Sequence, residues 1–308
     1  MNGPAPAFRC SDAARARGDD PAGTAVPAVR LLLVELPGPW PRDPRTRLDP
    51  AVVGPLEATA NAAGTRLLLV RRPGRHPADR VRPHRWALAD TRPGIEAVHW
   101  GVWRTDRDLA AVDPRAAVLP REARATGPQE VALVCTHGSR DVCCAVRGRP
   151  VAAALAGLAD LDVWESTHLG GCRFAGNAVL LPTGDTFGGL DPASAAAVVV
   201  RWRAGRLDAR HYRGRLGRPP VAQVVSALAA RALGDDRRDA VSVRSVSPAG
   251  ADGLRRAVVE HDGRHHRAVF RLDPRPAARL TCSAALADHP RRPVLVTLEP
   301  PREDAAAP

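Results

Sequence analysis

Four of the six cysteines of this chain lie between residues 135 and 172, with a histidine among them. They form two short runs: Cys135-Thr136-His137-Gly138-Ser139-Arg140-Asp141-Val142-Cys143-Cys144 and His168-Leu169-Gly170-Gly171-Cys172. Thiolates combined with an imidazole are ligands that suit zinc or an iron–sulfur cluster. Clustered cysteines in a chain without a secretory signal more often bind metal or take part in redox chemistry than form structural disulfides. We therefore expect a metal centre in this segment.

The elements around these runs predict that the ligands converge. Residues 130–134 read as a strand, Arg149–Leu158 as a helix with Pro150 at its start, and Asp162–Ser166 as a second strand. In a parallel βαβ unit the carboxyl ends of both strands lie at one edge of the sheet. Cys135 and the run 168–172 should therefore meet at that edge, beside the loop that carries residues 138–144.

Ligand types alone leave two kinds of centre open. A tetrahedral zinc site would use Cys135, His168, Cys172 and either Cys143 or Cys144. Structural zinc ligands usually come in short pairs, and the wide spacing after Cys135 disfavours such a site in a binding or scaffold protein.

The same runs resemble the sucrase/ferredoxin-like family, whose cluster domain is a thioredoxin-like 2Fe–2S ferredoxin. The resemblance extends to residues 163–167 and 173–177, to Cys10-Ser11-Asp12, and to the segments 21–25, 35–40 and 212–215. It implies that Cys135, Cys144, His168 and Cys172 hold the cluster. Many members have a second histidine where this chain has Cys172, so the implied set is three thiolates and one imidazole. Cys143 is then a packed or spare thiol, and we expect Cys10 and Cys282 to be packed thiols.

This resemblance implies an electron carrier with no catalytic residue of its own. One imidazole in place of a thiolate raises the reduction potential, so we expect a value between plant-type (~−400 mV) and Rieske centres (~−150 to +300 mV). The second nitrogen of His168 should make reduction depend on pH. Arg140 and Arg173 are candidates to stabilise the reduced cluster. His137 is either a neighbour of the ligands or a surface-loop residue. The chain has no hydrolase motif and no Cys-x-x-Cys dithiol.

The element order predicts an α/β fold with an internal repeat. Strand, helix, strand, two antiparallel strands and helix follow one another in the first half at Val29–Leu36, Asp49–Ala63, Arg66–Val70, Arg85–Ala89, Ala97–Trp103 and Asp106–Ala117. In the second half a hairpin over 177–190 and a helix from Asp191 complete the same order, which resembles a thioredoxin-like core. We hypothesise that the two halves arose by duplication, and that only the second kept ligand cysteines.

The domain organisation follows from this order. We predict an N-terminal segment (1–28) that is irregular or contains a short helix around Ala13–Arg17. An N-terminal α/β domain (29–120), a ferredoxin domain (128–205), a C-terminal α+β appendage (206–300) and a disordered tail (301–308) follow. The appendage begins with a linker, Gly205–Pro220, followed by a helix, Val221–Leu233, and four short strands.

The net charge of +12 says little about partners, because all 45 basic residues are arginines and the arginines are spread along the chain. One dense stretch is a candidate docking surface for an acidic redox partner, around Arg201, Arg203, Arg206, Arg213 and Arg215. Its alternative is an ordinary solvated face, and nucleic-acid binding is not expected. No apolar run approaches the ~20 residues that span a bilayer, and no signal peptide is evident, so we expect a cytoplasmic protein.

Overall fold

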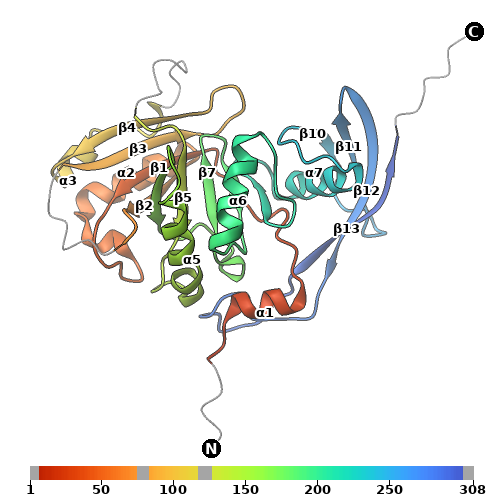
Figure 1. The fold of residues 1–308 in the computed structure, drawn as a ribbon, viewed down its shortest axis with the longest axis horizontal. Coiled ribbons are helices and arrows are strands. Elements are labelled where there is room, and N and C mark those ends of the chain that lie inside the picture. The colour runs from red at the N-terminus through yellow and green to blue at the C-terminus, as the bar shows by residue number, and fades with distance from the viewer. Residues whose placement is uncertain (1–6, 75–82, 117–126, 301–308) are drawn as a thin grey trace, which may run out of the picture.

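A computed structural model describes residues 7–74, 83–116 and 127–300 (Figure 1). Its strands form two sheets, a mixed sheet of nine strands and an antiparallel sheet of four. Among these residues, no helix is long and apolar enough to cross a membrane. The predicted tail, 301–308, lies outside the described residues.

The first half of the large sheet contains one parallel pair and one antiparallel hairpin. β1 (Arg30–Glu35) and β2 (Thr65–Arg71) run parallel and are joined by helix α2 (Pro50–Ala62). β3 (His84–Asp90) pairs antiparallel with β1, and β4 (Ala97–Trp103) pairs antiparallel with β3. The helix that follows, α3, covers only Asp106–Leu109, and the predicted end of that helix at Ala117 lies outside the described residues.

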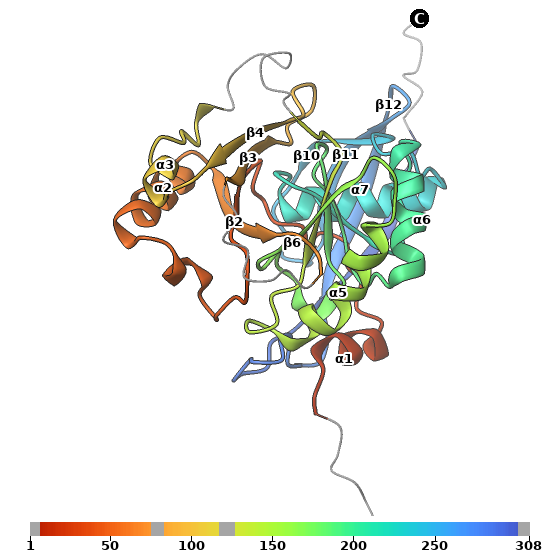
Figure 2. The same cartoon turned by 60° about the vertical axis from the view of Figure 1, so that its left-hand side comes forward.

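The second half repeats this arrangement. Its elements are β5 (Val131–Cys135), α5 (Val142–Leu155), β6 (Asp162–Ser166), β7 (Ala178–Leu181), β8 (Asp185–Phe187) and α6 (Pro192–Arg203). β5 and β6 are parallel, whereas β7 is antiparallel to β5 and β8 is antiparallel to β7. Helices α5 and α6 lie side by side over these strands (Figure 2).

The two halves join through β2 and β6, which pair antiparallel at their carboxyl ends through Val70 with Ser166 and Arg71 with Glu165. The full order is β4-β3-β1-β2-β6-β5-β7-β8-β9. Read outward from the joint, each half therefore has the same strand order and the same strand directions. A lack of common order would have refuted the duplication hypothesis, and the structure passes that test.

The C-terminal part differs from the predicted linker. β9 (Tyr212–Arg215) lies within Gly205–Pro220 and pairs with β8, so the large sheet extends beyond residue 205. The segment was predicted to be a linker because its arginines were taken to be solvated. In the structure two of them, Arg213 and Arg215, are buried. The N-terminal segment contains helix α1 (Cys10–Arg17), which starts three residues before the short helix predicted there as the alternative to an irregular segment.

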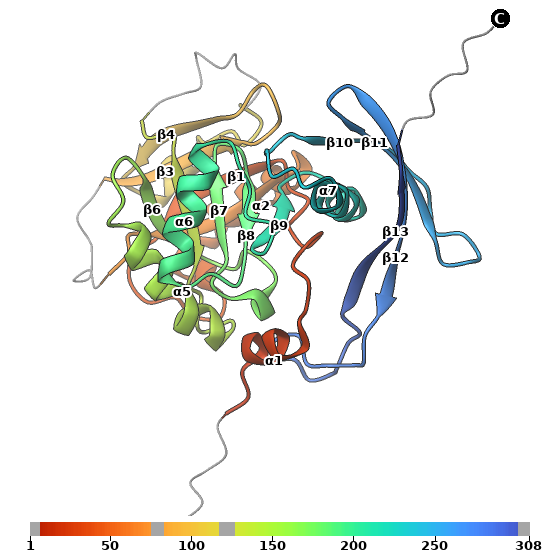
Figure 3. The ribbon, with the colours of Figure 1, turned by 45° about the vertical axis from the view of Figure 1, so that its right-hand side comes forward.

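The second sheet covers one side of a long helix. Helix α7 (Pro220–Leu233) packs against it and against β9, between the two sheets (Figure 3). The strands of this sheet are β10 (Val241–Val246), β11 (Arg255–His261), β12 (Arg264–Pro274) and β13 (Arg291–Glu299). The connection between β12 and β13 runs beside α1, where Arg275 donates a hydrogen bond to the carbonyl of Arg17.

β5 lies at the centre of the large sheet and is buried along its whole length. Leu133 and Cys135 point into a cluster that also contains Leu31 and Leu33 of the first half. Val134 points to the opposite face, into the cluster beneath α5 and α6. Because alternate residues of a strand face opposite sides, an apolar run such as 131–135 suits a strand covered on both faces.

Helix α5 begins earlier than the sequence predicts. The predicted start at Arg149 is wrong, since the helix starts at Val142 and carries Pro150 in its interior. Its N-cap is Asp141, whose carboxylate accepts the N–H of Cys143 at 3.0 Å. Cys143 and Cys144 consequently lie in the first helical turn rather than in a loop.

Gly148 allows α5 to sit directly on the end of β5. A Cβ atom at this position would lie 2.1 Å from the carbonyl oxygen of Cys135. Real Cβ atoms do not approach a backbone oxygen this closely, so any larger residue must move the helix away from the strand.

We predict that Gly148→Ala lowers the free energy of unfolding by about 1–3 kcal/mol. The steric destabilisation by the added methyl group should exceed the stabilisation from the higher helix propensity of alanine. Gly54→Ala is the matched control: Gly54 is a helical, exposed glycine with no tertiary neighbour around it, and alanine there should change stability by less than about 0.5–1 kcal/mol, because the following Pro55 offsets the gain in helix preference. Urea unfolding of both variants checks this. A Gly148→Ala protein as stable as the wild type would contradict the close contact.

Candidate metal centre

The structure brings the four predicted ligands into one contact group. Cys135 ends β5, Cys144 lies in the first turn of α5, His168 follows β6, and Cys172 begins the short helix η3 (Cys172–Phe174). Cys172 Sγ lies 3.4 Å from His168 Nδ1. The thiol of Cys144 forms hydrogen bonds with Cys135 and Cys172, and His168 forms them with the same two residues.

Hydrogen bonds within the group set its protonation. The bond from Cys144 holds the pKa of Cys135 well below its usual range and lowers the pKa of Cys172 to about 6. Acting as the donor raises the pKa of Cys144. Hydrogen bonds with Cys135, the larger cause, and with Cys172 raise the pKa of His168 to about 9. Two of the three sulfurs are therefore readily ionised, which is the state in which cysteine binds a metal.

Backbone groups also bind the sulfur of Cys135. The N–H groups of His137 and Leu169 both donate to this sulfur. Such N–H to sulfur bonds are among the interactions that tune the potential of iron–sulfur clusters.

Two glycines form the loop between His168 and Cys172. Gly170 and Gly171 have φ values of 81° and 65°, in the left-handed region that glycine adopts without strain. A Cβ atom on Gly171 would lie 2.4 Å from the guanidinium of Arg213. The Gly-Gly pair thus lets the ligand loop rest directly on a buried arginine.

Arg213 is a cation beneath the ligands. Its side chain is fully buried, and burial lowers its pKa to about 10. The guanidinium donates to the carbonyl of Gly170 at 3.1 Å, to Asn177 Oδ1 at 2.9 Å, and to the hydroxyl and carbonyl of Thr24. The sequence reading placed Arg213 on a surface, and only the motif at 212–215 could have indicated its role.

The cations that adjoin the centre differ from those predicted. Arg66 is half-buried and donates to the carbonyl of His168 at 2.6 Å. Arg173, by contrast, lies 3.6 Å from the carboxylate of Asp19, and Arg140 is exposed. Arg66 and Arg213, rather than the predicted pair, place positive charge against the ligand loop.

The centre is closed on one side and open on the other. Cys135, Cys144 and Cys172 are at most 3% exposed, whereas His168 is half-buried. His168 lines a cleft of about 580 Å³ together with His137 and arginines that include Arg140. The imidazole is thus the ligand that a molecule in the cleft would approach.

His137 is a buried neighbour of the ligands, not a surface-loop residue. Its Nε2 lies 2.9 Å from the carbonyl oxygen of Pro41, to which it donates, and its ring packs edge-on against Trp40 at 5.9 Å. Burial lowers the pKa of His137, so the ring is neutral at pH 7. Its role in the fold is to hold the loop after β1 over the site.

The arginines of the predicted docking surface fall into two groups. Arg213 and Arg215 are buried, at 0% and 3% exposure, and cannot contact a partner. The remaining residues pair with carboxylates, Arg201 and Arg206 with Asp236, and Arg203 with Glu130. An acidic partner bound there stays a prediction, and it would have to use the outer faces of these three ion pairs.

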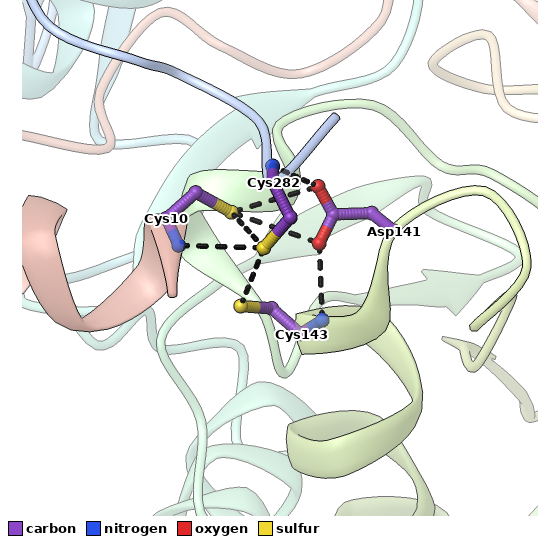
Figure 4. Close-up of side chains that lie close together, drawn as sticks. All are labelled: Cys10, Asp141, Cys143 and Cys282. Carbon is purple, nitrogen blue, oxygen red and sulfur yellow. Dashed lines mark hydrogen bonds between the residues drawn. The ribbon is translucent and has the colours of Figure 1, made fainter. Parts of the chain in front are cut away.

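The other three cysteines form a second group. Cys143 Sγ lies 3.3 Å from Cys282 Sγ, and Cys282 Sγ lies 3.6 Å from Cys10 Sγ (Figure 4). Burial raises the pKa of Cys10 far above its usual range and that of Cys282 to about 11. Sequence reasoning missed this group because Cys10 and Cys282 are 272 residues apart and share no motif.

Comparison with known proteins gives one match. The family model described as sucrase/ferredoxin-like matches residues 21–214, which is more than half of the chain and runs from the segment before β1 to β9. Neither the curated proteins nor the solved structures contain a significant match to the chain.

We predict that Arg213→Gln lowers the free energy of unfolding by about 3 kcal/mol or more. Hydrogen bonds from a charged group contribute about 1.5–3 kcal/mol each, and this substitution leaves several buried acceptors unsatisfied. Arg206→Gln is the control, because an exposed ion pair contributes about 0–1 kcal/mol. Thermal or urea unfolding distinguishes them, and equal losses in the two variants would contradict the role assigned to Arg213.

Proposed function

The chain belongs to the sucrase/ferredoxin-like family, and we propose that its second half holds a 2Fe–2S cluster and transfers electrons. The observation that carries this proposal is the contact group of Cys135, Cys144, His168 and Cys172, which gathers four soft ligands from four separate elements. When bound, the cluster would supply one-electron redox chemistry.

The residues present fit such a group. Three nearly buried thiols, two of them with lowered pKa values, and one imidazole provide four donors of the right chemistry. The backbone donors to Cys135 and the guanidinium groups of Arg66 and Arg213 supply positive charge around them. A cluster becomes more negative on reduction, and positive charge around it would stabilise that state. The match to a ferredoxin-like family favours the cluster over the zinc alternative.

Each residue then has a defined task. Cys135, Cys144 and Cys172 would hold the cluster away from water, with α5 and the Gly-Gly loop orienting them. His168 would hold it at the exposed edge, where the second ring nitrogen could exchange a proton with the cleft. Electrons would enter and leave along this edge, because a partner in the cleft comes closest to the imidazole there.

We further propose that both halves are thioredoxin-like. The order strand, helix, strand, strand, strand, with the third strand antiparallel to the first, occurs in each half. The segment between β1 and α2 and the first turn of α2, which correspond to the β5–α5 segment and the turn that carries Cys143 and Cys144, contain no cysteine. The first half would therefore be a related unit without a centre of its own.

We predict two irons per chain and a brown protein, with both lost in Cys135→Ala and in Cys144→Ala. Cys143→Ala is the matched control, since Cys143 contacts Cys282 instead of the ligand group, and it should keep iron and colour. Iron analysis and a visible spectrum of anaerobically purified protein check this. A colourless protein whose zinc is lost in Cys135→Ala would establish the zinc alternative instead.

We predict that His168→Cys makes the reduction potential more negative and removes its pH dependence. The added thiolate carries negative charge, and the proton that the imidazole binds on reduction is no longer available. In the wild type the potential should fall as pH rises, with a limiting slope of about 59 mV per pH unit for one proton and one electron. Spectroscopic redox titration between pH 6 and 10 measures both quantities. A flat wild-type profile would argue against imidazole ligation.

A further inference from the structure

Beside the proposed cluster site lies a second set of ligand atoms from three distant parts of the chain. Cys10 comes from the start of α1, Asp141 and Cys143 from the start of α5, and Cys282 from the connection between β12 and β13. The three sulfurs and one carboxylate oxygen of Asp141 all lie within 4.8 Å of one another. Figure 4 shows the sulfur of Cys282 between those of Cys10 and Cys143, with the carboxylate of Asp141 beside them.

The distances in this set match those around a tetrahedral ion. The Cys143–Cys282 and Cys10–Cys282 sulfur pairs are separated by 3.3 and 3.6 Å, and Cys10 Sγ lies 3.6 and 3.7 Å from the two oxygens of Asp141. Zinc–sulfur bonds of about 2.3 Å in tetrahedral geometry place the sulfurs about 3.8 Å apart. A disulfide, by contrast, would use two of the thiols and leave the third unpaired.

Asp141 presents a buried carboxylate to the three thiols. The residue is 3% exposed, and its carboxylate accepts the N–H of Cys143 at 3.0 Å and the N–H of Cys282 at 2.8 Å. A carboxylate oxygen is a zinc ligand, so Asp141 offers a fourth donor beside the three thiols.

We propose that Cys10, Cys143 and Cys282 bind one Zn²⁺ ion as thiolates, with Asp141 as the fourth ligand. Each thiol releases its proton to solvent when the ion binds. Three thiolates and a carboxylate complete a four-coordinate site, which is typical of structural rather than catalytic zinc. The ion fastens α1 and the β12–β13 connection to the first turn of α5, the turn that carries Cys144. This proposal does not depend on which metal the neighbouring group holds.

The test measures metal in the full-length protein. Reduced protein is incubated with zinc chloride, freed of excess metal by gel filtration, and analysed for zinc and iron. We expect one zinc per chain in the wild type, and less than one tenth of that in Cys282→Ser with iron content and visible spectrum unchanged. Ser283→Ala, an exposed neighbour in the same segment, should keep both metals.

Two further measurements test the proposal even if Cys282→Ser folds poorly. Asp141→Asn keeps an oxygen that can cap α5 but loses the negative charge, so zinc affinity measured by chelator competition should fall about tenfold or more. In the wild type, a thiol reagent should modify the partly exposed Cys282 at least tenfold faster after zinc is removed by the chelator.

Three results would overturn the proposal. The first is a reduced wild-type protein that retains no zinc. The second is a disulfide between Cys282 and either Cys10 or Cys143, found by peptide mapping of protein purified with reductant. The third is zinc that persists in Cys282→Ser but is lost in Cys135→Ala, which would place the ion in the other group and would count against the cluster as well.

Discussion

The contact between α5 and the carboxyl end of β5 determines where the soft ligands of this protein lie. Because Gly148 has no side chain, the helix rests on the carbonyl of Cys135 and its first turn reaches the end of the strand. That turn carries Cys143 and Cys144, whose side chains point to different groups. One helical turn thus supplies neighbouring residues to two separate sets of ligands. A shift of this helix would disturb both sets together.

Buried charge is the second constraint, and the ligand loop depends on it. The guanidinium of Arg213 replaces water as the donor to the backbone around Gly170, and Arg66 does the same at His168. A loop of two left-handed glycines has few internal hydrogen bonds, so its shape is fixed from outside. The cations that hold the loop are also those that would stabilise negative charge on the ligands. Structural support and electrostatic tuning are therefore performed by the same side chains.

Local patterns allowed much of the architecture to be predicted, because strands and caps are encoded within a few residues. The apolar run of β5, a helix that starts near Asp49 and the β3–β4 hairpin were all predicted from such signals. Helix α5 was misplaced because Pro150 reads as a helix start, although burial of one face keeps it in the interior. The proximity of Cys10 and Cys282 was not predicted, because it is created by the tertiary fold alone. The burial of Arg213 was not predicted, because a buried arginine and an exposed one look the same in sequence.

The short pairing between β2 and β6 determines how the two halves are arranged around the cleft. Since these strands overlap only at their carboxyl ends, the loops that follow both parallel pairs meet at the same place. The loop after β1 lies over the centre of the other half, where Ser139 donates to the carbonyl of Trp40 at 2.7 Å and His137 to that of Pro41. A half without ligands of its own thus forms one wall of its neighbour's cleft. A boundary drawn along the sequence at residue 128 would separate residues that line the same cleft.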